Sequence, residues 1–200
     1  MRICIITGIF PPDIGGPSSY LGWLAEALHN LGHKIRVVTY HDKKKRPDYP
    51  FPVYTIKRSK PLPSKIAETL AKSIHAALKS DIVYINGLLY PAVTACVIAR
   101  KPAVAKIVGD FAWERARNMN LTGETFDDFQ AEGMHRGKIG LWQRSRNFCL
   151  KRARRVIVPG MGLIKTVAGW GIEKEKITHI PNAVDPRSYQ DFQSVTKDEA

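Results

Sequence analysis

Seven short apolar segments, separated by stretches with a helical pattern, constrain the fold of this chain more than any other feature. Most of these segments lack the alternation of apolar and polar residues that marks a half-exposed strand, which indicates strands covered on both faces of a parallel sheet. Such alternation of strand and helix favours an α/β fold with a Rossmann-like, doubly wound parallel sheet. The predicted strands span residues 3–7, 35–40, 53–57, 82–86, 103–108, 156–158 and 177–180.

Helical patterns occupy most of the remaining chain. The first predicted helix carries a leucine stripe and lies between Pro17 and Gly32, residue types that stand where helices begin and end. Residues 113–140 form a long insertion with mixed charge, and segments of this kind in compact domains are usually functional or mobile. The predicted helices span residues 18–31, 64–79, 91–100, 138–154 and 160–170.

The length of 200 residues fits one compact domain with a sizeable core. No apolar segment approaches the roughly 20 residues that span a bilayer, and the opening apolar run is too short for a signal peptide. A cytoplasmic protein is therefore expected. The three cysteines, Cys4, Cys96 and Cys149, are far apart in the sequence and predict buried free thiols, as expected in a reducing compartment.

The formal net charge of +13 predicts an anionic partner. Basic residues cluster at 43–46, at 57–60 and along the predicted helix 138–154, which carries Trp142 and Phe148 on its other face. This helix indicates either docking on an anionic membrane surface or an ordinary solvated face whose aromatic stripe packs into the core. The candidates for facing a membrane are Arg144, Arg146, Lys151 and Arg154.

A glycine pair, Gly15 and Gly16, follows the first predicted strand and precedes the first helix. Glycines let backbone amides approach a ligand, and a helix amino terminus favours anions, so this loop is either a phosphate cradle or a plain turn. Its spacing matches neither the dinucleotide fingerprint nor the phosphate-loop motif, which argues against a dehydrogenase and an NTPase. The six histidines show no zinc-ligand spacing, and a Gly-x-Ser-x-Gly elbow is absent.

Motifs near both ends of the chain resemble glycosyltransferase family 4. The run FPPDIGGPSSY at 10–20 is similar to the beginning of these enzymes, and ARRVIVP at 153–159 to the last full strand of their first domain. The run IPNAVD at 180–185 resembles the motif that closes this domain, with Ala183 where many relatives have glycine. These landmarks cover almost the whole chain in the family's order.

The resemblance implies the N-terminal half of a GT-B fold, in which two Rossmann-like domains face each other. Residues 1–185 would be the acceptor-side domain, and residues 186–200 would begin the linker to a donor-binding domain. The complete enzyme would transfer a hexose, with retention, from a nucleotide-diphosphate sugar to an acceptor hydroxyl, with no cofactor and no metal. Acceptors of polysaccharide, lipopolysaccharide or glycolipid synthesis are expected, and the given segment alone is expected to be inactive.

The resemblance also implies roles for individual residues. Gly15 and Gly16 match the loop that faces the donor diphosphate. Asp110 follows a central strand where many relatives place a histidine that touches the donor sugar, so it is the predicted catalytic residue, acting as a hydroxyl ligand. Further candidates for sugar or acceptor binding are Asp13, which could instead form a turn, Asn86, which could also simply turn the chain, and Glu114.

Two observations leave other interpretations open. The same scaffold serves sugar-nucleotide epimerases and phosphorylases, so the reaction is not settled by the fold. The positive charge also suits a non-catalytic binding module, although the usual nucleic-acid motifs are absent and no nucleic acid is expected. Lys106, inside a predicted strand, is expected to reach solvent or to pair with a carboxylate, because lysines are almost never fully buried alone.

Overall fold

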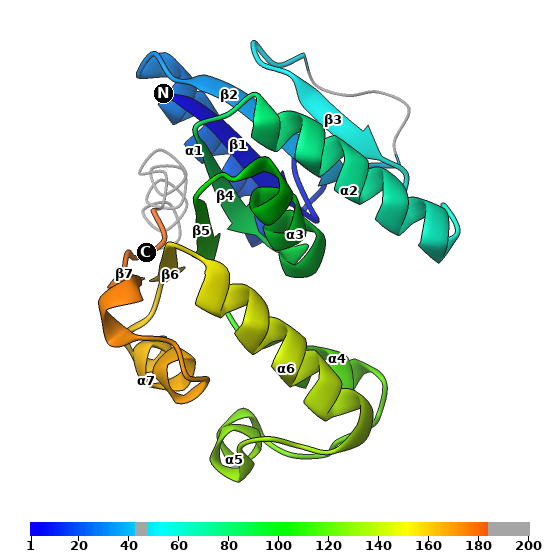
Figure 1. Cartoon of the computed structure of the whole chain (residues 1–200), viewed down its shortest axis with the longest axis vertical. Coiled ribbons are helices and arrows are strands. Elements are labelled where there is room, and N and C mark those ends of the chain that lie inside the picture. The colour runs from blue at the N-terminus through cyan, green and yellow to red at the C-terminus, as the bar shows by residue number, and fades with distance from the viewer. Residues whose placement is uncertain (43–47, 184–200) are drawn as a thin grey trace, which may run out of the picture.

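The computed structural model describes residues 1–42 and 48–183. In this part of the chain, seven strands form one parallel sheet in the order β3-β2-β1-β4-β5-β6-β7 (Figure 1). The direction of strand addition reverses between β1 and β4, which confirms the predicted Rossmann-like fold. All seven predicted strands are present. They are β1 (Arg2–Thr7), β2 (Lys34–Tyr40), β3 (Val53–Ile56), β4 (Ile82–Asn86), β5 (Ala103–Lys106), β6 (Arg155–Val158) and β7 (Ile177–His179).

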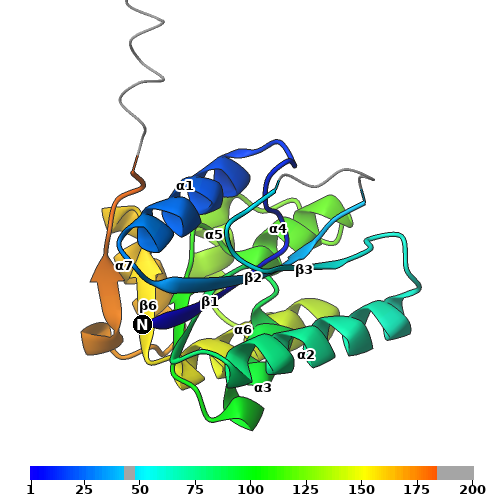
Figure 2. The same cartoon turned by 90° about the horizontal axis from the view of Figure 1, so that it is seen from above.

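Helices lie on both faces of the sheet, with α1 on the face opposite α2 and α3 (Figure 2). A smaller core, with Ile5, Leu21 and Val37, lies between the sheet and α1. A larger core on the other face includes Cys96, Leu150 and residues of α7. The predicted helices correspond to α1 (Gly16–Asn30), α2 (Leu62–Leu78), α3 (Leu89–Ala99), α6 (Gly137–Arg152) and α7 (Met161–Gly169).

The long insertion folds into two further helices, α4 (Phe111–Asn118) and α5 (Phe126–Glu132). Each begins at a residue whose side chain caps it: Asp110 accepts a hydrogen bond from the amide of Ala112 at 2.9 Å, and Thr125 accepts one from Asp128 at 3.3 Å. A short 3₁₀ turn, η1 (Lys174–Lys176), precedes β7. The insertion thus forms a wall of the domain rather than an irregular loop.

The buried stripe of α6 differs from the predicted one. Leu141 and Phe148 are 64% and 50% exposed, whereas Gln143 and Arg146 are buried. Of the two interpretations of this helix, the one in which its aromatic stripe packs into the core was wrong for Phe148, although Cys149 is buried. Gln143 and Arg146 take part of the buried face because they find partners in the insertion. The expectation that Arg146 faces a membrane is wrong for the same reason, since its side chain is only 3% exposed.

Two other expectations can be compared with the structure. Cys4, Cys96 and Cys149 are free and buried, as predicted. Within the described residues, none of the helices combines the length and the apolar character that a membrane span requires. The basic run 43–46, the residues Val184 and Asp185 of the closing motif, and the predicted linker at 186–200 lie outside the described residues.

Candidate functional site

A pocket of about 520 Å³ lies at the carboxyl ends of β4 and β5. Open α/β sheets bind ligands at this edge, close to the point where the strand order reverses. The turn after β4 forms one side of the pocket, the segment after β5 forms the second, and α4 and α6 form the third. Its size is within the range of small-molecule sites.

The walls of the pocket are mostly apolar. The side chains of Leu89, Trp142 and Trp170 line it together with a few polar residues, among them Asn86 and Ser145. Asn86 is the last residue of β4 and is 9% exposed. An apolar pocket with a few convergent polar groups is the usual form of a site for an organic ligand, because the apolar walls supply affinity and the polar groups fix orientation.

A sharp turn joins β4 to α3 at the rim of this pocket. Gly87 and Leu88 both adopt left-handed backbone conformations, with φ of 92° and 49°. A Cβ on Gly87 would lie 3.5 Å from the backbone nitrogen of Gly8, so this turn packs closely against the loop that follows β1. The pocket and the loop that leads from Gly8 to Gly15 and Gly16 therefore lie on the same edge of the sheet and meet at Gly8.

A buried ion pair between Asp110 and Arg146 lies next to the pocket. Asp110 Oδ2 accepts hydrogen bonds from Arg146 Nη1 and, at 2.9 Å, from Gln130 Nε2. The guanidinium of Arg146 lies 3.6 Å from the centre of the Trp170 ring, and Trp170 Nε1 donates to Gln130 Oε1 at 2.8 Å. Burial lowers the pKa of Arg146, although the nearby carboxylate opposes this effect. This closed network joins α4, α5, α6 and the end of α7.

Asp110 therefore holds α4, α5 and α6 together in this structure. Both of its carboxylate oxygens are engaged within the protein, and its side chain has no exposed surface. A direct catalytic contact of Asp110 with a sugar stays a prediction, and it would require this ion pair to open. The sequence did not reveal the network because its members lie 20 to 40 residues apart along the chain.

Glu114, the neighbouring candidate, lines the pocket itself. Its carboxylate lies against the backbone of Gly109, where an added Cβ would be 2.6 Å from Oε1. Burial and the charge of Asp110 raise the pKa of Glu114. The structure thus brings a carboxyl group with weakened acidity to the wall of the pocket, one turn from Asp110.

We expect the substitution Glu114→Gln to stabilise the domain near neutral pH and to have no effect at about pH 4. A carboxyl group whose pKa is raised on folding costs stability as the pH rises through that pKa, because the folded state then holds a disfavoured charge. Solvent screens this partly exposed group, so the gain should be about a few tenths of a kcal/mol. Denaturant unfolding at both pH values measures it; an equal difference at the two pH values would contradict the electrostatic cause.

The glycine loop lies beside the pocket and precedes α1. Gly15 has a φ of 149°, and α1 begins at Gly16 without a side-chain cap. First-turn amides without a capping side chain are a common binding place for anions. Ser18 Oγ donates to the carbonyl of Asp13 at 2.7 Å, which holds the loop against the helix.

Arg58, which sequence reasoning missed, fixes the other side of this loop. Its Nη2 atom donates to the carbonyl of Gly8 at 3.1 Å and to Asp13 Oδ2. Its backbone amide donates to Asp42 Oδ1 at 2.8 Å. Asp13 is thus the partner of an arginine, and its predicted contact with a ligand hydroxyl stays a prediction. An open hollow of about 500 Å³ lies between this ion pair and Ile14.

Lys106, the last residue of β5, is buried, and the expectation for it was wrong. It is 2% exposed, and its ammonium group has no hydrogen-bond partner among the described residues. Instead, Nζ lies 3.5 Å from the centre of the Tyr20 ring. The aromatic face replaces the expected carboxylate, since a ring quadrupole attracts a cation. Tyr20 in turn lies 3.4 Å from Tyr84, hydroxyl to hydroxyl, and burial raises the pKa of Tyr84.

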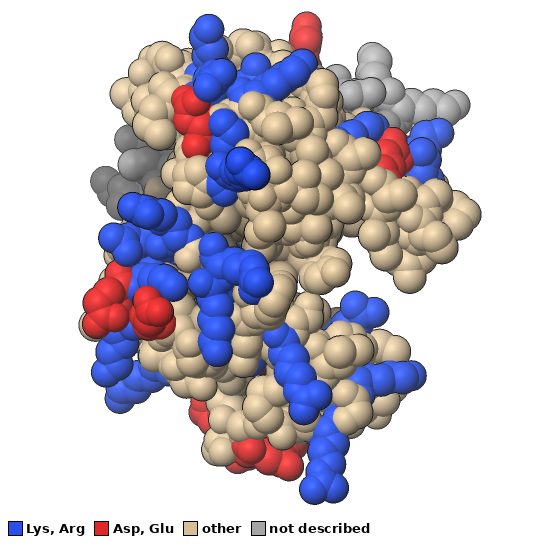
Figure 3. All heavy atoms as spheres, viewed as in Figure 1, with Lys and Arg blue, Asp and Glu red and all other residues tan. Residues whose placement is uncertain are grey.

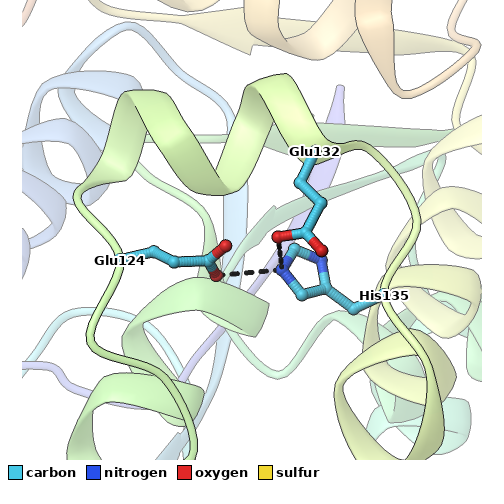
Figure 4. A group of neighbouring side chains, drawn as sticks. All are labelled: Glu124, Glu132 and His135. Atoms are coloured by element: carbon cyan, nitrogen blue, oxygen red, sulfur yellow. Dashed lines mark hydrogen bonds and ion pairs between the residues drawn. The ribbon is translucent and has the colours of Figure 1, made fainter.

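One group of side chains in the described part of the chain has the composition of a metal site. Glu124, Glu132 and His135 bring their potential ligand atoms within 4.8 Å of one another (Figure 4). His135 Nε2 lies 3.0 Å from Glu124 and 3.5 Å from Glu132. A hydrogen bond from Glu132 lowers the pKa of Glu124 to about 2, and the same contact raises the pKa of Glu132.

The surroundings of His135 argue against metal binding at this group. The amide of Gln143 is oriented by two backbone partners, the amide of His135 at 2.8 Å and the carbonyl of Gly133 at 2.8 Å. Its NH₂ group therefore donates to His135 Nδ1 at 3.2 Å, which places the ring hydrogen of a neutral imidazole on Nε2. The nitrogen that faces the carboxylates is thus a donor, not a metal ligand. Gln143 of α6 joins this group to that helix through His135, and we call the group together with Gln143 the clasp.

Comparisons with known proteins agree with the fold. The sequence model of Glycosyltransferase Family 4 matches residues 14–188. HepE from Anabaena, in complex with UDP and glucose, is similar in structure, with a TM-score of 0.64, 16% identity, and coverage of 98% of this chain and 50% of HepE. No curated protein sequence matches the chain.

Two other solved structures resemble the chain to a similar degree. Sucrose-phosphate synthase from Thermosynechococcus elongatus has a TM-score of 0.60 at 16% identity, with coverage of 90% of this chain and 47% of the synthase. UDP-GlcNAc 2-epimerase from Methanocaldococcus jannaschii has a TM-score of 0.60 at 14% identity, with coverage of 91% and 46%. The chain thus has the fold of the N-terminal half of a GT-B enzyme and spans about half the length of these structures.

Proposed function

Because the chain belongs to glycosyltransferase family 4, we propose that it is the acceptor-side half of a retaining enzyme that transfers a hexose from a nucleotide-diphosphate sugar to an acceptor hydroxyl. The observation that carries the proposal is the apolar pocket beside an uncapped helix amino terminus, both on the carboxyl edge of the sheet. The pocket suits an acceptor, and the loop at Gly15 and Gly16 suits the anionic leaving group of the donor. Closure of a second domain over this edge would complete the site.

The separate roles of the glycine loop and the pocket follow from the chemistry of transfer. A negative charge grows on the leaving diphosphate as the bond to the sugar breaks, and backbone amides that are already oriented stabilise such a charge most effectively. Arg58 keeps these amides in place through Gly8 and Asp13. The walls formed by Trp142 and Trp170 exclude water from the acceptor. This scheme requires neither a metal ion nor a cofactor.

We expect the substitution Gly16→Ala to lower kcat/KM for the donor about tenfold or more while the stability of the fold is unchanged. A Cβ at Gly16 meets no heavy atom within 4 Å, so the methyl group costs nothing in the free protein. It would, however, occupy the space through which a diphosphate approaches the loop. The effect is measured with the full-length protein, as the rate at which it releases nucleoside diphosphate with and without acceptor.

Gly123→Ala is the matched control, because that glycine is equally open but lies in the insertion. We expect it to keep the kinetic constants of the parent protein. An unchanged kcat/KM for Gly16→Ala would remove the glycine loop from the donor site. If no acceptor accelerates the release of nucleoside diphosphate, the transferase proposal itself is wrong.

The second candidate is a sugar-nucleotide epimerase, which the similarity to UDP-GlcNAc 2-epimerase favours. An epimerase changes one carbon of the sugar without an acceptor. Nuclear magnetic resonance spectra of the products distinguish the two reactions, since transfer with retention keeps the anomeric configuration and attaches the sugar to a new oxygen. The transferase is preferred because the family model covers almost the whole described chain.

The acceptor is proposed to carry an apolar part, since most of the pocket surface is apolar. Lipid-linked sugars and the precursors of polysaccharides or lipopolysaccharides satisfy this requirement. We propose that the enzyme meets such acceptors at the cytoplasmic side of a membrane. An assay with a free sugar and with the same sugar on a lipid carrier tests the point, and equal KM values would contradict it.

A further inference from the structure

We propose that the face formed by α3 and α6 docks on an anionic lipid membrane. Both helices are free of Asp and Glu, whereas α6 alone contains five Lys and Arg residues. Basic side chains follow α6 and gather near its carboxyl end, beside an uncharged surface over α3 (Figure 3). A helix pair without a single carboxylate is complementary to a surface that is negative throughout.

The carboxyl ends of the two helices meet in a basic groove of about 640 Å³. Seven Lys and Arg residues line it, against Glu173 and Glu175. Glu173 pairs with Lys176 at 3.3 Å, and the other six basic residues are opposed only by Glu175, so the groove keeps a large excess of positive charge. Its members include Arg100 and Lys101 after α3, and Lys151, Arg152 and Arg154 at the end of α6.

Large apolar side chains stand beside this groove. Val97 and Ile98 of α3 are 56% and 55% exposed, and Phe148 of α6 is 50% exposed. The guanidinium of Arg152 lies 3.6 Å from the centre of the Phe148 ring, so the charged and apolar parts of the surface are in direct contact. Exposed apolar groups next to arginines are typical of proteins that insert side chains below lipid headgroups.

These apolar groups favour a membrane over a nucleic acid. A phosphate backbone attracts the basic groove, but aliphatic side chains such as Val97 and Ile98 contribute nothing to phosphate contacts. The face also includes part of the predicted basic surface: Arg144, Lys151 and Arg154 are exposed, whereas Arg146 is not. The docking face adds residues of α3, which the sequence pattern of α6 alone did not indicate.

Docking on this face would also serve the pocket. The amino-terminal end of α3 and the middle of α6 line the pocket, and the carboxyl ends of both helices line the groove, so one helix pair joins the two. A membrane held at the groove would bring lipid-borne acceptors to the apolar walls. This consequence rests on the proposed function, whereas binding to the membrane does not.

Sedimentation with vesicles tests the proposal. We expect the protein to bind vesicles of equal parts phosphatidylcholine and phosphatidylglycerol, and to bind phosphatidylcholine vesicles weakly. The triple substitution Lys101→Gln, Lys151→Gln and Arg154→Gln should weaken binding about 100-fold, since each charge near an anionic surface contributes roughly a fivefold factor. The matched control, Lys34→Gln, Lys57→Gln and Lys165→Gln, removes the same charge from other elements and should change binding little.

A second variant tests insertion of the apolar groups. Val97→Ser with Phe148→Ser keeps every charge and should lower the binding that remains at high salt. Equal loss in the two triple variants would show that net charge alone attracts the protein, and would overturn the proposal. So would unchanged vesicle binding in the Lys101 triple variant together with weakened binding to a DNA or RNA oligonucleotide. Transfer to a water-soluble acceptor tests the proposed function separately. This activity persists if the docking proposal alone is wrong.

Discussion

Replacing Arg146 by methionine is expected to lower the free energy of unfolding by about 3–5 kcal/mol. The side chains of Asp110 and Arg146 are 0% and 3% exposed, so the substitution leaves a carboxylate inside the protein without its cation. Methionine fills much of the same volume, and therefore the loss measures the uncompensated charge more than a cavity. A decrease of this size lowers the Tm of a domain of this length by about 10 °C.

Arg144→Met is the matched control, because Arg144 lies on the same helix and is exposed. We expect it to change stability by less than about 0.5 kcal/mol. The double variant Asp110→Asn with Arg146→Met should recover much of the loss, since asparagine still caps α4 and no buried charge remains. If Arg144 and Arg146 give equal losses in denaturant unfolding, the buried pair does not exist as described.

The contrast between the buried Arg146 and the exposed Arg144 also shows how much of this molecule could be predicted from sequence. The seven strands depend on local apolar runs, and each was found within a few residues of its bounds. The fold class followed, because continuous apolar runs in alternation with helices have few other solutions. Strand ends also placed Gly15, Gly16 and Asn86 on the carboxyl edge of the sheet, and Asn86 lines the pocket found there.

The wall of the site could not be predicted, because long-range pairing determines it. Whether Arg146 or Arg144 is buried depends on Asp110, Gln130 and Trp170, which lie on three other elements. Helical periodicity favoured the apolar stripe through Phe148, which is the usual outcome. Lys106 was misjudged for a related reason: its partner is the ring of Tyr20, and the sequence does not show which aromatic ring faces a strand.

Gly140→Ala is expected to destabilise the domain by about 2 kcal/mol or more, although alanine is the better helix former. A Cβ on Gly140 would lie 2.1 Å from the carbonyl oxygen of His135. That oxygen belongs to the backbone just before α6, where Gly137 has a φ of 62°, so it cannot move away as a flexible side chain would. The added methyl group must displace His135, and with it the clasp to Glu124 and Gln143.

Gly162→Ala makes the identical chemical change in α7, where a Cβ meets no heavy atom within 4 Å, and should stabilise by up to about 1 kcal/mol. Opposite signs in thermal unfolding would therefore isolate the contact with His135 from helix propensity, which favours alanine at both positions. Stabilisation by Gly140→Ala would mean that the clasp does not hold the insertion against α6. Because α6 also carries Trp142 and Ser145 into the pocket, hydrogen exchange of the insertion should rise in Gly140→Ala and not in Gly162→Ala. The clasp stabilises the wall, and the wall shapes the pocket in which we place the acceptor.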